Sequence, residues 1–509
     1  MNLNGLDRED LLSLIASLRE ENTYLKQEVN FLKEQLEWLK RQLFGVRSEK
    51  LKPLNHEQLE FEGFDSLNKE KPETKIVKQH ERKKPNRNGQ DKITLPDDIP
   101  VKTTILDVPE SEKICPDTGK ALVKIGEEKS YRLAHQPGSY YLKEIIRPKY
   151  AHPIQKDQGI KIADLPDSII SKCRADESLL AEIAVQKFGD HLPLYRMTQI
   201  MERSQIQISR KLLSQWMVKV GLALEPLYRE MTKKILQGDQ LFIDETPIKL
   251  QAKTKCKQAY LWVMVGGGNS PNPPYKIYDF RENRKHQHGL DLLQGYRGTI
   301  HSDKYGAYEK IAKITQVKWQ PCWAHIRRKF FEIPGEDPFK SEVLRKIKYL
   351  FLLEKVGWNR SPEERLKIRK EKEEPIIDEL IKNIKGKLAD RDLLPKSKKG
   401  DAVKYFCGLI GHLKTYLTRA YTSISNNVAE RAIRPVAIGR KNWLFFGSEQ
   451  GGKAGGILLS LIQTCRGLGI NPRDYLEDIF RRIMSHPAKK VAELLPDQWL
   501  LHQKKSQPL

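Results

Sequence analysis

The sequence predicts a multidomain α/β protein, and three observations lead to this prediction. The chain has 509 residues, enough for roughly three to four domains of ordinary size. Leucines recur every seven residues near the N-terminus, which is typical of a coiled-coil helix. Between Gln240 and Gln320 the pattern changes to apolar strands, with helical patterns on either side. We therefore predict one larger domain with a mixed sheet, preceded by smaller modules.

The composition is strongly basic. Lys and Arg total 90 against 66 Asp and Glu, which gives a formal net charge of +24 and a pI of about 9.5. Such an excess suits a protein that binds a polyanion better than it suits a metabolic enzyme. Residues 431–509 contribute a surplus of seven to this excess, because they contain 13 Lys and Arg against six Asp and Glu.

Cysteine spacing and hydropathy indicate the cellular compartment. The six cysteines stand singly, without a C-x-x-C pair. This argues against a disulfide framework and an intact four-cysteine zinc site, and it fits a reducing compartment. The sequence lacks a secretory signal pattern and an apolar run of about 18 residues. We therefore expect a cytoplasmic protein that makes no membrane contact.

Residues 1–50 are predicted to form a coiled-coil helix. Leucines of the predicted seam fall seven apart, at Leu11, Leu18, Leu25, Leu32 and Leu39. Asn22 takes one seam position, where a polar side chain fixes register and oligomer state at a cost in stability. We expect this helix to join subunits into a homo-oligomer; the alternative is that it packs on its own chain.

Two less regular segments follow. Residues 51–98 are rich in Lys, Arg, Pro, Asn and Gln, which predicts a mostly disordered basic linker. The linker is either a solvated tether or an arm that contacts DNA. Residues 99–160 alternate apolar and polar side chains around a CPDTGK turn, which predicts a small β-rich module.

Residues 170–225 are predicted to contain a helix-turn-helix. A short turn at Gln205 to Ile208 separates two helices. The second helix opens with polar and basic side chains, and we predict that these contact DNA in the major groove. They are Ser209, Arg210, Lys211 and Ser214. The alternative is an all-helical linker, which can show the same pattern.

Residues 236–334 contain the strands of the predicted mixed sheet. Three strands joined by short turns precede a helix and a parallel strand, which is the plan of the ribonuclease H fold. Acidic residues of that plan lie where the first and fourth strands end, here at Asp244 and Asp303. Side chains alternate along a strand, so Asp244 and Glu245 point to opposite faces, whereas His301 and Asp303 share one. This selects Asp244 only provisionally, because a lone acid often merely ends a strand.

A third carboxylate is predicted on a later helix. This helix is expected to begin after a cap at Ser425 or Asn426 and to end at Pro435. The side chains of one face, at i, i+3 and i+7, are Asn427, Glu430 and Arg434. The basic residues expected to hold DNA phosphates here are Arg431, Arg434, Arg440 and Lys441.

Three further segments complete the predicted organisation. Residues 335–419 are strongly helical and charged, and they are predicted to be a helical insertion between the two parts of the sheet domain. The alternative is a solvated helical hairpin without a catalytic part. Residues 420–485 are predicted to be the last part of the sheet domain, and residues 486–509 a C-terminal tail.

The three acids together suit one kind of chemistry. Two Mg²⁺ ions, with Mn²⁺ as a substitute, need hard oxygen ligands, and such a pair assists attack on a phosphodiester. Asp244, Asp303 and Glu430 are therefore candidate Mg²⁺ ligands as well as candidate catalytic residues.

The chain resembles a bacterial insertion-sequence transposase of the family numbered sixty-six over almost all of its length. The resemblance rests on QLFGVRSEKL, DHLPLYRMTQI, LLSQWM, DETP, HSDKYGAY, CWAHIRRKF and NNVAERAIRPVAIGRKNWLFFGSEQGG, in this order. It implies a DDE transposase with a ribonuclease H-like catalytic domain, and Asp244, Asp303 and Glu430 match the family's catalytic triad.

This resemblance implies a function and partners. Such an enzyme binds terminal inverted repeats, hydrolyses the phosphodiester at transposon ends and joins the 3′-hydroxyl to target DNA. Small accessory proteins of the same element and association with the nucleoid are also implied. Two alternatives are a non-catalytic DNA-binding regulator, and a ribonuclease H-like nuclease or resolvase without strand transfer.

One departure from the family concerns zinc. The family usually has cysteine pairs in two zinc knuckles near residues 110–155. This chain keeps Cys115 but has Thr118 where the second cysteine belongs, and its second knuckle offers only His152. Tetrahedral structural zinc requires four ligands, so we expect a degenerate module without zinc.

Smaller motifs are assigned supporting roles. Cys322 and His325 are too few for a metal site by themselves, and we favour packing near Asp303 over a metal pair. His301 and Asn427 are expected to support the same acids. The GSEQGGKA segment resembles a phosphate-binding loop, but Ala454 stands where Ser or Thr would bind Mg²⁺, which favours a glycine-rich turn.

Overall fold

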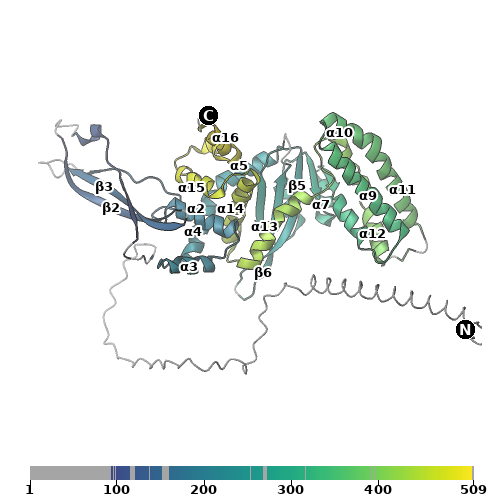
Figure 1. The fold of residues 1–509 in the computed structure, drawn as a ribbon, viewed down its shortest axis with the longest axis horizontal. Coiled ribbons are helices and arrows are strands. Elements are labelled where there is room, and N and C mark those ends of the chain that lie inside the picture. Colours follow the sequence, from purple (N-terminus) through teal and green to yellow (C-terminus); the bar gives the residue numbers. More distant parts are fainter. Residues whose placement is uncertain are drawn as a thin grey trace, which may run out of the picture. The chain divides into compact units, whose positions relative to one another are not determined.

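A computed structural model describes the chain from residue 93 to residue 506. Residues 94, 96, 98, 115–120, 137, 152–159, 253, 268–271, 316, 391–392 and 395 within this range are not described. The chain divides into Met1–Asn86 and Arg87–Leu509, and all described structure belongs to the second unit (Figure 1). The predicted coiled coil of residues 1–50 and nearly all of the predicted linker of residues 51–98 therefore lie outside the described residues.

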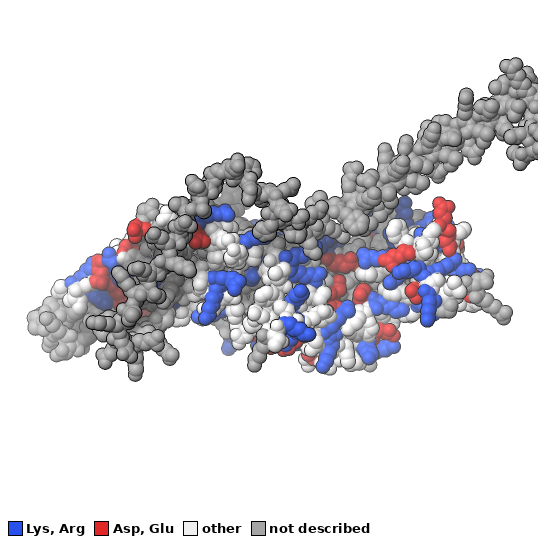
Figure 2. Space-filling model, turned by 90° about the horizontal axis from the view of Figure 1, so that it is seen from below, with Lys and Arg blue, Asp and Glu red and all other residues white. Residues whose placement is uncertain are grey.

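The described part is a mixed α/β structure, as predicted. Lys and Arg side chains are spread over the middle of the face seen in Figure 2, with Asp and Glu side chains between them. Within the described ranges, no helix combines the length and the apolar character needed to cross a bilayer.

A small sheet of four strands comes first. Its strands are β1 (Val101–Ile105), β2 (Val123–Gln136), β3 (Ser139–Ala151) and β4 (Ile160–Ile162), and η1 (Glu110–Lys113) follows β1. Strand β3 lies between β1 and β2, and β4 also pairs with β3. Strands β2 and β3 form a long antiparallel hairpin, whose turn contains Gly138 at a φ of 84°, a region that glycine enters without steric cost.

Four helices connect the small sheet to the large one. They are α2 (Glu177–Phe188), α3 (Leu194–Arg203), α4 (Arg210–Ala223) and α5 (Glu225–Ile235). Asp176 caps α2 by accepting a hydrogen bond from the Ser178 amide, and Ser209 caps α4 by accepting one from the Leu212 amide. Helix α4 buries Leu213, Trp216 and other apolar side chains against the core, so its remaining face is free for contacts.

The large sheet lies at the centre of the described structure. Its strands are β5 (Gln240–Leu250), β6 (Lys257–Gly266), β7 (Lys276–Arg281), β8 (Thr299–Ser302), β9 (Lys318–Pro321) and β10 (Phe445–Phe446). The order is β7-β6-β5-β8-β9, with β10 beside β5. Strand β6 runs antiparallel to both β7 and β5, whereas β8 pairs parallel with both β5 and β9.

One strand boundary differs from the prediction. Strand β5 was expected to end at Asp244, but it continues to Leu250. It continues because β6 pairs with it along its whole length and β10 pairs with its last two residues. Asp244 therefore lies in the middle of a rigid strand.

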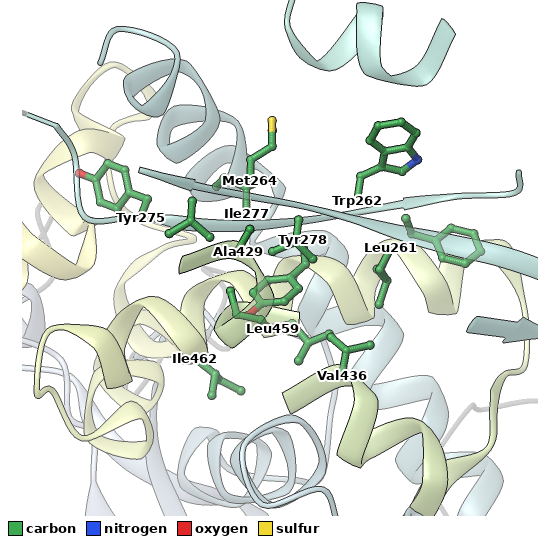
Figure 3. Close-up of a cluster of buried hydrophobic side chains, with 14 of the residues drawn as sticks. Leu261, Trp262, Met264, Tyr275, Ile277, Tyr278, Ala429, Val436, Leu459 and Ile462 are labelled. Carbon is green, nitrogen blue, oxygen red and sulfur yellow. The ribbon is translucent and has the colours of Figure 1, made fainter. Parts of the chain in front are cut away.

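Helices cover both faces of this sheet. Helices α6 (His286–Leu292) and α7 (Gly306–Thr315) cover one face, where Trp262 contacts Tyr308 edge to face. Helices α13 (Asn427–Trp443) and α14 (Glu449–Gly467) cover the other, where the Tyr278 hydroxyl donates to the Ala432 carbonyl. Figure 3 shows Trp262 and Met264 on one side of the strands and Tyr278 on the other, so the core has two layers.

Helix α13 is longer than predicted. Pro435 was expected to end it, yet the helix continues through this proline to Trp443. An internal proline removes one backbone hydrogen bond and costs about 3 kcal/mol. Burial of Val436, Gly439 and Trp443 against the sheet offsets this cost.

The remaining helices lie between β9 and α13 and after α14 (Figure 1). Between β9 and α13 the chain forms α8 (Trp323–Phe331), α9 (Pro338–Gly357), α10 (Pro362–Ile368), η3 (Arg369–Glu373), α11 (Glu374–Leu388), α12 (Lys398–Cys407), η4 (Ile410–His412) and η5 (Thr415–Thr418). After α14 it forms α15 (Pro472–Arg482), η6 (Ala488–Leu494) and α16 (Pro496–Ser506). Segment η3 is a π-helical turn that joins α10 to α11.

Candidate active site

Three different elements carry the three predicted acids. Asp244 lies within β5, Asp303 follows directly after β8, and Glu430 lies in the first turn of α13. Strands β5 and β8 are paired in parallel with Phe242 opposite His301, so Asp244 and Asp303 each follow two residues later on adjacent strands. The sheet therefore brings these two carboxylates to neighbouring positions.

The pKa of Asp244 reflects the carboxylates around it. Burial and the charges of Glu245, Asp303 and Glu430 raise the pKa of Asp244 to about 7. The Glu245 amide acts against this rise by donating to Asp244 Oδ1 at 2.8 Å. The carboxylates of Asp303 and Glu430 thus act on Asp244 in β5.

Asn426 connects the elements that carry these acids. Its side chain is fully buried, and its Nδ2 donates to the carbonyl oxygen of Ile243, the residue before Asp244, at 3.0 Å. Its backbone amide donates to Cys322 Sγ at 3.1 Å. Asn426 occupies the N-cap position of α13, but its side chain does not cap the helix. It fixes α13, and therefore Glu430, against β5.

Glu245 lies on the opposite face from Asp244, as strand alternation predicts. Its Oε1 accepts from Arg284 Nε at 2.5 Å and also contacts Nη2, and its Oε2 accepts from the Tyr308 hydroxyl. Burial raises the pKa of Glu245, while Tyr308 and Arg284 act against this rise. Both carboxylate oxygens of Glu245 are therefore occupied within the protein.

Cys322 and His325 lie beside Glu430. The Sγ of Cys322, a ring nitrogen of His325 and a carboxylate oxygen of Glu430 lie within 4.8 Å of one another. His325 Nδ1 is 3.6 Å from Glu430 Oε1. Burial raises the pKa of Cys322 to about 11, so it is a neutral thiol that accepts hydrogen bonds. The structure thus adds a carboxylate to the pair that the sequence had placed near Asp303.

The two other predicted supporting residues have different surroundings. His301 is fully buried and stacks on Phe242, with ring centroids 4.4 Å apart. Burial and the charge of Arg369 lower the pKa of His301 to about 3, so the ring is neutral. Asn427 is half-buried at the start of α13, where Asn426 makes the contacts to β5 instead.

The predicted DNA-contacting residues fall into two groups. Ser209, Arg210, Lys211 and Ser214 are all exposed along α4. On α13, Arg431, Arg434 and Lys441 are exposed. Arg440 is instead half-buried, and its Nη1 donates to Thr246 Oγ1 at 2.8 Å and to the Pro247 carbonyl at 2.6 Å. Arg440 therefore braces α13 against β5.

Two residues of the predicted zinc remnant cannot be placed. Cys115 and His152 lie outside the described residues. The surrounding segment forms the small sheet of β1 to β4.

Comparisons with known proteins match family patterns to most of the chain. The sequence pattern of the family described as "Transposase IS66 family" matches residues 172–454, which include all three acids. The pattern described as "IS66 C-terminal element" matches residues 460–496, and the one described as "Transposase C of IS166 homeodomain" matches residues 31–104.

Relatives in Sinorhizobium fredii cover most of the chain. The uncharacterized protein y4qI is 33% identical over 409 residues, which cover 77% of this chain and 75% of the relative. The uncharacterized protein y4jD is 29% identical over 516 residues, which cover 97% of this chain and 96% of the relative. Because the family pattern spans more than half of the 509 residues, the chain belongs to the IS66 family of transposases.

Proposed function

We propose that this protein is a DDE-type transposase with a ribonuclease H-like catalytic core. In this proposal it binds terminal inverted repeats, hydrolyses the phosphodiester at the transposon ends and joins the freed 3′-hydroxyl to target DNA. The observation that carries the proposal is that parallel pairing of β5 with β8 and the Asn426 contact to Ile243 bring Asp303 and Glu430 to Asp244, whose pKa their charges raise. The order β7-β6-β5-β8-β9, with two antiparallel pairings followed by two parallel pairings, supports the assignment of the core.

The acids fit divalent cations. Hard carboxylate oxygens are the ligands that Mg²⁺ and Mn²⁺ prefer. A pKa of about 7 for Asp244 means that its charge is poorly compensated by protein groups, which is what a cation site requires. We assign Asp244, Asp303 and Glu430 to hold two Mg²⁺ ions. Bound Mg²⁺ would supply activation of the attacking oxygen and charge stabilisation at the leaving oxygen.

The protein's own residues keep the acids in place. Asn426 and Arg440 hold α13 against β5, so Glu430 cannot move away from Asp244 without breaking buried hydrogen bonds. The Tyr305 amide donates to Asp303 Oδ1 at 3.0 Å and orients that carboxylate. Preorganisation of this kind avoids reorganisation of the site during the reaction.

DNA binding is assigned to exposed basic residues. Arg210 and Lys211 at the start of α4 would read the terminal repeat, with Ser209 and Ser214 beside them. Arg431, Arg434 and Lys441 on α13 would contact phosphates near Glu430. The net charge of +24 supports such contacts. Each phosphate contact should add roughly 0.9 to the slope of log affinity against log salt.

Partners follow from the same proposal. We propose a homo-oligomer through the N-terminal coiled coil, so that two subunits hold two transposon ends. Small accessory proteins of the same element are further candidate partners. We propose no zinc cofactor, because Cys115 and His152 alone provide too few ligands.

A joining assay tests the proposed function. The full-length protein is incubated in Mg²⁺ with a precleaved duplex that carries the inverted repeat flanking its gene and a free 3′-hydroxyl. Joined products are expected with target DNA present, and none without a divalent cation. Cleavage without joining would indicate a ribonuclease H-like nuclease or resolvase, and binding without either would indicate a regulator.

A further inference from the structure

Arg284 is held in place beside the acids by three groups. It lies in the loop between β7 and α6, and its Nε and Nη2 both contact Glu245 Oε1. Its guanidinium carbon lies 3.6 Å from the ring centroid of Tyr305, which is a close cation–π contact. The Tyr305 hydroxyl donates to the Arg284 carbonyl at 3.1 Å. Both the side chain and the backbone of Arg284 are therefore fixed.

The fixed guanidinium still has a free side. The side chain of Arg284 is 38% exposed, whereas that of Glu245 is 1% exposed. Among the residues that the structure describes, Nη1 of Arg284 donates no hydrogen bond. Arg284 thus turns one edge to a buried carboxylate and leaves donors for another partner.

Tyr305 links Arg284 to Asp303. Partial burial lowers the pKa of Arg284, but the charges of Glu245, Tyr305 and Asp303 outweigh it and raise the pKa. Tyr305, which stacks on Arg284, is also the residue whose amide binds Asp303. No direct ion pair joins Arg284 to Asp303 among the described residues, so a further group can lie between them.

Stability alone gives a weak reason for this arrangement. A buried ion pair gains little over apolar side chains of the same shape, because both charges must leave water. Two other basic side chains near the acids are already engaged by carbonyls. Arg440 donates to Pro247, and Lys304 donates to the Tyr405 carbonyl at 3.0 Å. Arg284 combines a fixed position with unused donors.

We propose that Arg284 is a phosphate-binding residue of the active site. Its free edge contacts a DNA phosphate next to Asp303, and Glu245 and Tyr305 act as positioning residues that orient it. A planar guanidinium suits this role because it matches the geometry of phosphate oxygens. The inference rests on the proposed function, since it needs DNA at the three acids.

A substitution combined with a change in the DNA tests this inference. End cleavage by the full-length protein is measured in Mg²⁺ on duplexes that carry one uncharged methylphosphonate at each position around the cleavage site. R284A should lower the cleavage rate by roughly 10²–10³-fold, as loss of one transition-state donor does. At the contacted phosphate, the methylphosphonate should slow the wild-type protein but should not slow R284A further.

A matched control comes from α5. Arg229 Nε and Nη2 also donate to a single carboxylate oxygen, Glu225 Oε1, at 3.0 and 2.6 Å, but its side chain is 75% exposed. R229A should therefore cleave every duplex as the wild type does. R284K keeps a cation beside Glu245. If R284A does not fold, cleavage of the same methylphosphonate duplexes by R284K tests the inference.

Different failures have different meanings. If the losses caused by R284A and by the methylphosphonate multiplied at every position, the inference would be overturned. A purely structural role for Arg284 predicts such independent losses. An unchanged rate for R284A would overturn it as well. If wild-type protein bound the end DNA but did not cleave it in Mg²⁺, the proposed function would fail, and the phosphate contact with it.

Discussion

Two groups of carboxylates in this protein differ in burial and in the presence of a buried arginine, because Glu354 is buried whereas the three acids are half-buried. Around Arg369, the guanidinium donates to both oxygens of Glu354 at 2.6 and 2.7 Å. It also donates to the carbonyls of Tyr416 at 2.7 Å and Thr422 at 2.8 Å. At the three acids, no comparable cation is present among the described residues, and the pKa of Asp244 rises to about 7.

We read this difference as one of role. The Arg369–Glu354 pair stabilises the fold, whereas the three acids keep their charge for a ligand. The Arg369 cluster fixes residues 416–422, which lead into α13 and Glu430. The charges of Arg369 and Glu354 compensate each other, so this pair can hold the helices between β9 and α13 on the sheet. Asp244 and Asp303 accept backbone amides, but among the described residues the three acids lack a buried arginine, and a divalent cation would compensate their charge. Each region can be perturbed to test this reading.

The largest expected effect is on DNA cleavage when one of the three acids is substituted. D244N, D303N and E430Q should each lower end cleavage by at least about 10³-fold, because these groups act as one unit. Their free energies of unfolding should be unchanged or higher, since each substitution removes one of three repelling charges. Cleavage gels and urea unfolding measure the two quantities. E282Q on a nearby loop is the control, and a large loss of stability in D244N would contradict the comparison.

Substitution of the buried Arg369 should instead lower the stability of the fold. R369M leaves Glu354 buried without its cation and several carbonyls without a donor, so it should lower the free energy of unfolding by about 3–5 kcal/mol. R345M removes an exposed arginine from α9 and should change stability by less than about 0.5 kcal/mol. Urea unfolding at neutral pH checks both variants. Equal stabilities would show that the cluster does not hold the fold.

Divalent cations should stabilise the folded protein by binding at Asp244, Asp303 and Glu430. At 100 times its Kd, Mg²⁺ should raise the free energy of unfolding of the wild type by about 2.7 kcal/mol. D244N should gain much less, whereas R345M should gain as much as the wild type. Thermal unfolding with and without Mg²⁺ gives the result. The same gain in D244N would place the cation elsewhere.

The smallest change, when measured per pH unit, concerns proton binding by Glu373 beside the Arg369–Glu354 pair. Burial and the charge of Glu354 raise the pKa of Glu373 to about 8, above the value of about 4.3 for an unfolded chain. The folded state therefore binds this proton more tightly. Its contribution to stability is complete below about pH 4 and is lost as the pH rises through about 8.

Unfolding at a series of pH values tests this assignment. Between pH 5 and 8 the wild type should lose up to about 1.4 kcal/mol per pH unit from this group, and E373Q should lose correspondingly less. E371Q, which changes a more exposed residue of the same π-helical turn, should follow the wild type. Parallel curves for wild type and E373Q would show that Glu373 does not titrate in this way.

Much of the candidate site could be predicted from local sequence patterns. Strand alternation correctly set Glu245 on the face opposite Asp244, and the helix carrying Glu430 was expected from its flanking polar residues. The prediction that Pro435 ends this helix was wrong, because local propensity does not include burial of Val436 and Trp443. The end of β5 was misplaced for the same reason, since pairing with β6 and β10 extends it.

The sequence by itself determined the family, the basic character and the kinds of residue available for chemistry. These follow from motifs and periodicities that a short window of residues contains. Only the tertiary structure decided that Asn426 joins α13 to Ile243, that His325 lies beside Glu430 and that Arg284 is fixed by Glu245. These contacts join residues far apart in the chain, and burial and charge pairing select them only once the sheet has formed.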